Sequence, residues 1–202
     1  PASPRVLEFS PERNAQGLLL DVGVRVVFNT PMDSEATGSA FTLISENGEP
    51  VPGSITWKDD GAELIFTPTQ QLTLDTEYVA SVGESARALT GALLDQPLRW
   101  SFTTVPYPEV TAMTPADDAR GIELYQPVRI AFAGAIDQDA VMSQVVITPT
   151  VAEDETYSFW DGDVLQLMWD KEPRTEYCIG VQPDVPDLYG NTTETGLEHC
   201  FT

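Results

Sequence analysis

Apolar and polar residues alternate over short stretches of this chain, as they do in strands that bury one face. Val24, Val26 and Phe28 share one side of such a stretch, and Ile130 and Phe132 do the same later in the chain. Further stretches with a period of two contain Ile55 and Trp57, Leu64 and Phe66, Tyr78, Ala80 and Val82, Trp100 and Phe102, and Tyr177, Ile179 and Val181. The pattern predicts a chain built of short strands.

Helical turns are expected in only two places. Residues 34–40 and 139–144 each follow a strand stretch, and the Asp and Ser residues there are good N-caps. The 16 prolines and 14 glycines of the chain punctuate the strand stretches. Many short strands separated by turn residues predict an all-β fold of two tandem antiparallel β-sandwiches.

The strand pattern occurs twice because the chain contains an internal repeat. A first set of residues recurs as the same residue type 104 positions later, and consists of Pro11, Ala15, Gly17, Phe28 and Asp33. A second set recurs 99 positions later, and consists of Thr76, Glu77, Tyr78, Leu89, Gly91, Phe102 and Thr103. The second copy is therefore shorter by five residues (104 − 99). A deletion of this kind is expected in a loop or at a strand margin.

The repeat predicts two domains, residues 1–104 and 109–202, joined by a linker at residues 105–108. Pro106 and Pro108 lie in that linker. Because proline fixes its own φ angle and biases the preceding residue toward extended conformations, we expect the linker to be short and semi-rigid.

Several motifs resemble those of the bacterial Ig-like domains that occur in tandem in S-layer proteins, adhesins and other envelope proteins. Both copies open with Ser/Thr-Pro, contain Thr-Glu-Tyr and end with Phe-Thr, and the first has Pro-Met-Asp at residues 31–33. The turn at residues 187–191 and the entry at residues 107–111 are similar, more narrowly, to the N-terminal Ig-like pair of bacterial alpha-2-macroglobulin-like proteins. The bait region and Cys-Gly-Glu-Gln thioester motif of that family do not occur here. The resemblance implies an Ig-like sandwich in each copy.

Cys178 and Cys200 are the only cysteines of the chain. By the spacing of 99, their counterparts in the first copy are Val79 and Ser101, on strands expected to be neighbours. Each cysteine is adjacent in sequence to an inward-facing aromatic residue, so both point to the opposite face, where a cross-strand disulfide is within reach. The disulfide implies an oxidising compartment. The alternative is two free thiols in a reducing cytoplasm.

Tyr78 and Tyr177 occupy equivalent positions in the Thr-Glu-Tyr motifs. In Ig-like sandwiches a tyrosine at such a position ties its hydroxyl back to the backbone at a corner. Repetition of the same residue at a framework position favours this structural role over ligand binding.

One acidic group suggests a calcium site, namely residues 153–155 together with Asp161 and Asp163, since calcium prefers several oxygen ligands. The order of an EF-hand loop is absent. The Asp-Gly pair at residues 161–162 also recurs at residues 60–61, and Asp-Gly between strands is a hairpin signal. A turn is therefore favoured, and no metal site is predicted.

The remaining candidates for chemistry have simpler structural interpretations. Asp117 and Asp118 lie near the linker and are a weak candidate for an ion site between domains. His199, the only histidine, precedes Cys200 on the final strand, where a solvated or cross-strand role is favoured over general-base catalysis. The chain has no Gly-x-Ser-x-Gly, phosphate-binding loop or Cys-x-x-Cys motif, and we assign no catalytic residue.

Composition limits the partners of this 202-residue chain. Its 32 Asp and Glu against 10 Lys and Arg give a formal net charge of -22, which disfavours nucleic acid and anionic membrane surfaces. No apolar run approaches the roughly 20 residues that span a bilayer. The chain begins at Pro1 without the features of a signal peptide, so we expect a segment of a larger protein. With Lys58 and Lys171 as the only lysines, a halophilic source is compatible with the sequence.

These features predict a non-catalytic spacer or presenting module at the cell surface or in a secreted protein, without a cofactor and monomeric as this segment. The expected partners are the remaining domains of the parent protein, and another envelope protein or a protease. Two alternatives stay open: supporting domains of an alpha-2-macroglobulin-like protease trap, and an accessory carbohydrate-binding domain. The second alternative needs exposed aromatic rings. Trp160 is the clear candidate, because Trp57, Trp100 and Trp169 fit strand faces.

Overall fold

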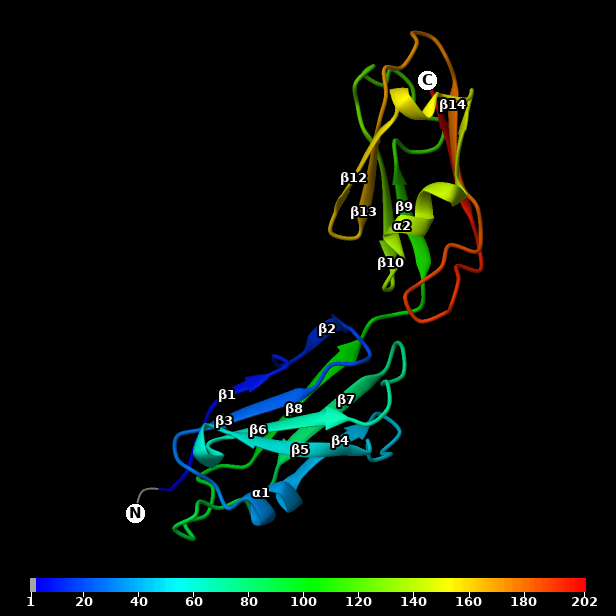
Figure 1. Ribbon diagram of the computed structural model, residues 1–202. Coiled ribbons are helices and arrows are strands. Elements are labelled where there is room, and N and C mark those ends of the chain that lie inside the picture. Colours follow the sequence, from blue (N-terminus) through cyan, green and yellow to red (C-terminus); the bar gives the residue numbers. More distant parts are fainter. Residues whose placement is uncertain (1–2) are drawn as a thin grey trace. The chain divides into compact units, whose positions relative to one another are not determined.

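The computed structural model describes residues 3–202 and divides into two compact units between Val105 and Pro106 (Figure 1). Val105 belongs to the first unit, although the sequence placed it in the linker. Its side chain is buried, its backbone N–H donates to the carbonyl of Leu18 over 2.8 Å, and its carbonyl accepts from the N–H of Asp75 over 3.0 Å. The first unit therefore extends one residue beyond the predicted boundary.

The first unit is a sandwich of two four-stranded sheets, ordered β1-β3-β6-β5 and β2-β8-β7-β4. The core lies between the two sheets, where the alternating apolar residues of both meet. The strands are β1 (Val6–Ser10), β2 (Ala15–Leu18), β3 (Val24–Phe28), β4 (Phe41–Ser45), β5 (Gly53–Lys58), β6 (Glu63–Pro68), β7 (Glu77–Val82) and β8 (Leu98–Thr104).

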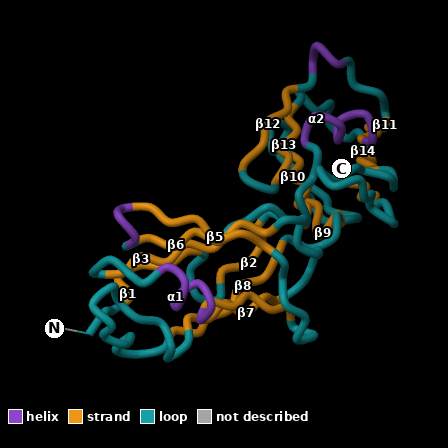
Figure 2. The backbone as a smooth tube through the Cα atoms, turned by 60° about the horizontal axis from the view of Figure 1, so that its bottom comes forward, coloured by secondary structure: helices purple, strands orange, loops and turns teal. Residues whose placement is uncertain are grey.

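The second unit repeats this topology with a four-stranded sheet, β9-β10-β13-β12, and a three-stranded sheet, β11-β14-β15. It has a separate core of the same construction. The strands are β9 (Glu109–Thr114), β10 (Val128–Ala133), β11 (Val145–Thr148), β12 (Tyr157–Asp161), β13 (Val164–Met168), β14 (Tyr177–Val181) and β15 (Leu197–Phe201). Within the residues described, strands dominate both units and helices are restricted to short segments (Figure 2).

The sheets are antiparallel apart from one pairing in each unit. Strand β2 runs parallel to β8, with Ala15 opposite Phe102, and a parallel bridge joins Ala119 to Phe201 at the equivalent place in the second unit. The sequence predicted antiparallel pairing throughout. Alternation of apolar residues reports which face of a strand is buried and carries no information on its direction.

The two predicted helical turns are present, but their N-caps are aspartates that lie just before the predicted ranges. Helix α1 (Ser34–Ala40) begins after Asp33, whose Oδ1 accepts a hydrogen bond from the N–H of Ala36 over 3.0 Å. Helix α2 (Gln138–Val141) begins after Asp137, whose Oδ1 accepts from the N–H of Asp139 over 3.2 Å. The 3-10 helices are η1 (Asp59–Gly61), η2 (Met142–Gln144) and η3 (Glu153–Glu155).

The predicted alternation of buried and exposed positions is confirmed along the strands of both units. Val24 and Val26 on β3 are fully buried, as are Val128 and Ile130 on β10. The equivalent inward positions of the second sheets are also buried, at Tyr78, Ala80, Val82, Tyr177, Ile179 and Val181. Across residues 3–202, no helix is long and apolar enough to cross a membrane.

Candidate functional site

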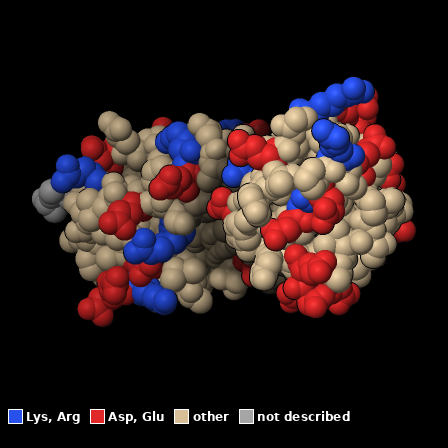
Figure 3. Space-filling model, turned by 90° about the horizontal axis from the view of Figure 1, so that it is seen from above, with Lys and Arg blue, Asp and Glu red and all other residues tan. Residues whose placement is uncertain are grey.

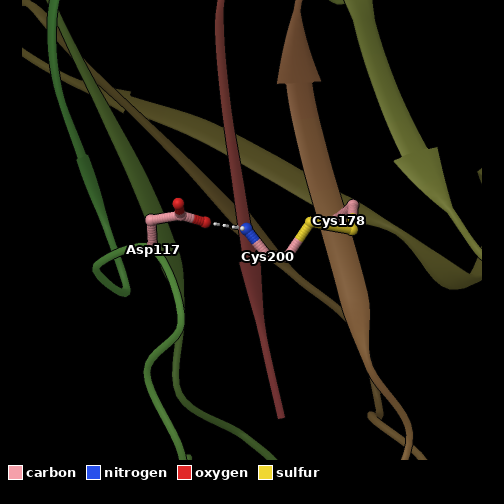
Figure 4. Close-up of a disulfide and its surroundings, with 3 residues drawn as sticks. All are labelled: Asp117, Cys178 and Cys200. Atoms are coloured by element: carbon pink, nitrogen blue, oxygen red, sulfur yellow. Dashed lines mark hydrogen bonds between the residues drawn. A yellow bond between two sulfur atoms is a disulfide. The ribbon is translucent and has the colours of Figure 1, made fainter.

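The two cysteines form a disulfide across neighbouring strands of one sheet. Cys178 on β14 pairs directly with Cys200 on β15, and their Cα atoms are 4.0 Å apart (Figure 4). The structure therefore contains the cross-strand bond that the sequence predicted. It staples two strands of the same sheet and does not join the two sheets of the sandwich.

Asp117 and Asp118 anchor a turn to the last strand beside this disulfide. The Oδ1 of Asp117 accepts a hydrogen bond from the N–H of Cys200 over 2.9 Å (Figure 4), and the N–H of Asp118 donates to the carbonyl of Cys200 over 2.8 Å. Both contacts lie within the second unit. These two hydrogen bonds give Asp117 and Asp118 a structural role, whereas the sequence made them a weak candidate for an ion site.

The first unit holds the same strand pair without a covalent bond. Val79 on β7 lies opposite Ser101 on β8, in the register of the two cysteines. Asn14 occupies the place of Asp118, because its N–H donates to the carbonyl of Ser101 over 2.8 Å and its φ angle of 60° matches the 59° of Asp118. The backbone framework around this strand pair is therefore shared, although the side chains of the pair differ.

Each unit contains the corner predicted from its tyrosine. The hydroxyl of Tyr78 accepts a hydrogen bond from the N–H of Thr73 over 2.9 Å. The hydroxyl of Tyr177 accepts from the N–H of Glu172 over 3.1 Å. Both tyrosines are buried, and both bonds reach five residues back along the chain. The two side chains thus fix equivalent loops to equivalent strands.

His199 takes part in a framework contact that Trp100 makes in the first unit. The indole Nε1 of Trp100 donates to the carbonyl of Pro11 over 3.0 Å, and the Nδ1 of His199 lies 3.0 Å from the carbonyl of Pro115. Both rings point from the last strand of their unit to the proline that follows the first strand. His199 is therefore held by a contact to the residue after β9, whereas the sequence favoured a solvated or cross-strand role.

The acidic residues considered for calcium lie at opposite ends of one strand. Residues 153–155 form η3, which precedes β12, whereas Asp161 and Asp163 flank the turn that follows β12. Four residue steps along β12 correspond to about 13 Å. Gly162 lies in this hairpin turn with a φ angle of +58°, as the Asp-Gly signal predicted. In the described part of the chain, no three His, Cys, Asp or Glu side chains are grouped to hold a metal ion.

Trp160 was the expected exposed aromatic ring, and this prediction is wrong. Its side chain is partly buried against the core, with its ring centroid 5.6 Å from that of Phe132. Trp160 lies on the inward face of the edge strand β12. Because side chains alternate along a strand, the residues one and three positions before Trp160 lie on the outward face. Tyr157 and Phe159 are 71% and 47% exposed.

A hollow of about 440 Å³ opens in the second unit beside Tyr157. Its wall includes Tyr125, which is 70% exposed, Met168 and the buried Trp169. Four carboxylates also line it, at Asp154, Glu155, Asp170 and Glu172. We refer to this feature as the tyrosine hollow. The sequence does not predict it, because its residues come from three separate segments of the chain.

Ion pairs distinguish the first unit from the second. The guanidinium of Arg25 bonds to the carboxylates of Glu63 and Glu8, and the bond from Arg25 lowers the pKa of Glu63. At the equivalent sheet position, Arg129 of the second unit donates to the neutral amide oxygen of Gln166 over 3.3 Å. Figure 3 shows acidic side chains gathered into patches on one part of the visible face and interspersed with basic side chains on another.

Asp33 is a second carboxylate of the first unit whose pKa is shifted. The N–H of Ala36 and then the guanidinium of Arg87 lower its pKa, because both stabilise the charged form. The Nε of Arg87 donates to Oδ2 of Asp33 over 3.0 Å. The cap of α1 is therefore also the acidic member of an ion pair.

Lys171 is a buried lysine where the first unit has the buried Leu72. Both residues donate their backbone N–H to an equivalent leucine carbonyl, that of Leu124 for Lys171 and that of Leu20 for Leu72. Burial lowers the pKa of Lys171. Its Nζ donates to the carbonyl of Gln126 over 2.7 Å and lies 4.2 Å from the centre of the Trp169 ring.

The two units are thus Ig-like sandwiches that share one framework. The sequence matches the family model of a bacterial Ig-like domain twice, over residues 1–104 and 106–202. The chain therefore belongs to the bacterial Ig-like domain family, which is a non-catalytic domain type. No curated protein sequence matches the chain.

Solved structures with similar folds come from several kinds of bacterial protein. CopC from Methylosinus trichosporium OB3b is 17% identical with a TM-score of 0.41, and the match covers 52% of this chain and 95% of CopC. Alpha-2-macroglobulin from Escherichia coli is 16% identical with a TM-score of 0.40, covering 71% of this chain and 43% of that one. The S-layer protein SbsC is 12% identical with a TM-score of 0.38, covering 100% of this chain and 26% of SbsC. Similarities at this level carry no argument about activity.

Proposed function

We propose that this chain is a structural and interaction module, a spacer or presenting stalk, of a larger bacterial envelope or secreted protein. The observation that carries the proposal is the repetition of one framework in two self-contained units of a bacterial Ig-like family. The tyrosine corners, the capped turns and the contacts of the last strands recur in both units. Tandem repetition of one self-contained unit suits an array that spaces other parts of a protein.

The side chains that suggest chemistry are engaged in holding the fold. His199 contacts the carbonyl of Pro115, Tyr78 and Tyr177 accept backbone hydrogen bonds, and Asp117 anchors the last strand. Their contacts support a non-catalytic role for both units.

The disulfide supports a location outside the cytoplasm, since reducing compartments keep protein thiols reduced. Cells of the source organism should be lysed in the presence of a thiol-alkylating reagent, and the peptides containing Cys178 and Cys200 analysed by mass spectrometry. We expect the two peptides to be joined and unalkylated. Two alkylated cysteines would contradict the proposed location.

The spacer role is tested by pulling the chain from its two ends with a force probe. We expect two discrete unfolding events, one for each unit. Since the disulfide closes a segment with a sequence separation of 22, the event of the second unit should lengthen by about 80 Å after reduction. A chain that extends at low force without discrete events would contradict a spacer role.

The alternative of supporting domains in an alpha-2-macroglobulin-like protease trap stays a hypothesis about the parent protein. A thioester motif and a bait region elsewhere in the full gene product would favour it. Their absence from the full gene product would leave the general spacer role as the proposal.

A further inference from the structure

The outward faces of equivalent strands differ between the two units. In the first unit, Ser54 on β5 lies opposite Thr67 on β6. In the second unit, Tyr157 on β12 lies opposite Met168 on β13. The tryptophans of the two edge strands fix this alignment, because each lies on the inward face opposite a buried leucine. The second unit therefore exposes apolar side chains where the first exposes hydroxyl groups.

A third position extends this difference. Phe159 lies two residues beyond Tyr157 on the same face of β12, and its counterpart on β5 is Thr56. Phe159 is 47% exposed and Met168 is 36% exposed. An exposed group of aromatic side chains on a shared framework requires an explanation beyond folding, because the first unit folds the same way with polar residues there.

The tyrosine hollow continues this apolar face. Tyr157 and Met168 belong to both, and Tyr125 adds a second exposed ring from the loop before β10. The rings of tyrosine offer negative π faces to a cation. The hollow is thus open and partly aromatic.

Four carboxylates surround these rings, and Lys171 offsets part of their charge through its electrostatic interaction with Asp170. Asp154 and Glu155 come from η3, and Asp170 and Glu172 from the segment after β13. None of the residues that line the hollow is a lysine or an arginine. The nearby Lys171 directs its Nζ to the carbonyl of Gln126. Residues 106–202 as a whole contain 18 Asp and Glu against 4 Lys and Arg, so the long-range field attracts cations as well.

Trp169 supplies an independent sign of an incomplete site. It lines the hollow and is only 3% exposed, yet its indole Nε1 is buried with no hydrogen-bond partner among residues 3–202. Buried donors in folded proteins nearly always have a partner. A ligand acceptor that reached this atom, such as a peptide carbonyl, would supply one.

We propose that the tyrosine hollow binds a lysine or arginine side chain presented by a basic segment of a protein partner. The aromatic rings contact the aliphatic stem and the face of the cation, and the carboxylates accept its hydrogen bonds. Neutral sugars also stack on aromatic rings, but they leave the negative charge of the carboxylates without a role. This inference goes beyond the spacer function and does not depend on it.

The test uses the full chain and an acetylated, amidated peptide of sequence Gly-Arg-Lys-Arg-Gly. Binding is measured by calorimetry, and the indole N–H signal of Trp169, assigned with Trp169→Phe, is followed by NMR. We expect saturable binding that shifts this signal and weakens as salt is added. The same peptide with glutamine in place of each basic residue should not bind.

Matched variants locate the site. The double change Tyr157→Ser with Met168→Thr installs the residues of the first unit and should weaken binding about tenfold or more, as should Asp170→Asn with Glu172→Gln. The control pair Asp161→Asn with Asp163→Asn removes the same charge at the other end of β12 and should change the affinity less than about twofold. Circular dichroism melts verify that each variant is folded.

Three results would overturn the inference. The first is no binding of the basic peptide at millimolar concentration. The second is an equal loss of affinity in the control pair, which would indicate attraction by the general charge only. The third is saturable binding of a neutral hexasaccharide in the hollow without binding of the basic peptide, which would assign the site to carbohydrate. None of these results bears on the two unfolding events that test the spacer role.

Discussion

The last two strands of each unit show how one framework is closed in two ways. In the first unit, Trp100 lies opposite the small Ala80, and the indole fills the space between the sheets. In the second unit, the smaller His199 lies opposite the larger Ile179. The larger side chain is thus on the last strand in the first unit and on its neighbour in the second. The contact between the ring and a proline carbonyl is the same in both units.

The neighbouring pair differs in a covalent bond. Val79 and Ser101 in the first unit share no covalent bond, whereas Cys178 and Cys200 in the second form a disulfide. An Ig-like framework therefore accepts either a disulfide or a non-covalent contact at this strand pair, provided that the backbone register is the same. The first unit relies on a large buried aromatic residue, and the second relies on a disulfide.

The largest effect is expected from truncating the two rings. Trp100→Ala should lower the free energy of unfolding of the first unit by about 3–5 kcal/mol, because it empties a buried aromatic position. His199→Ala should cost the second unit about 1 kcal/mol, since it removes one hydrogen bond and little buried area. Chemical denaturation of the full chain, followed in each unit by NMR, measures both values. Equal losses of unfolding free energy in the two variants would contradict the proposed difference between the units.

A transplanted disulfide sharpens the same comparison. Val79→Cys with Ser101→Cys places cysteines in the register of the natural pair. If the frameworks are equivalent, the new bond should form on oxidation and stabilise the first unit by up to about 3 kcal/mol. The single variant Ser101→Cys is the control. Two free thiols in the oxidised double variant would show that the strand pairs are not equivalent.

The tyrosine corners should respond alike in the two units. Tyr78→Phe and Tyr177→Phe each leave a backbone N–H without its acceptor and should cost about 1–2 kcal/mol. Thermal denaturation monitored separately for each unit is the measurement. A loss of stability in one unit only would mean that the two corners contribute differently to the free energy of unfolding.

The smallest effect at neutral pH is expected from the perturbed carboxylates of the first unit. The pKa values of Asp33 and Glu63 are lowered in the fold, so their stabilisation is present above the unfolded values of about 4 and is lost as the pH falls through the folded values. Asp33→Asn with Glu63→Gln should therefore flatten the acid dependence of the melting temperature of the first unit. Scans between pH 7 and pH 3 test this, with the exposed Glu46→Gln as the control.

Much of the framework could be predicted from the sequence because it depends on local signals and on repetition. The period of two indicates the inward residues, and the spacing of 99 places Cys178 beside Cys200, as the disulfide confirms. The parallel pairing of β2 was missed, since alternation does not encode strand direction.

The tyrosine hollow was missed for a different reason. Trp160 was chosen for its residue type, but its position in the alternation places it on the buried face, as Trp57 is in the first unit. The useful signal was the contrast between equivalent outward positions, with Tyr157 against Ser54 and Phe159 against Thr56. The position of Tyr125 next to these residues depends on loop conformations, which a single sequence does not specify.

The central claim is that the two units are independent copies of one framework that differ in how one strand pair is closed. Differential scanning calorimetry of the full chain with and without reductant tests it most directly. The account predicts that reduction lowers the melting temperature of the second unit by roughly 12–24 °C, equivalent to about 3 kcal/mol, and leaves that of the first unit unchanged. A second transition that does not respond to reductant, or an equal shift of both transitions, would contradict it.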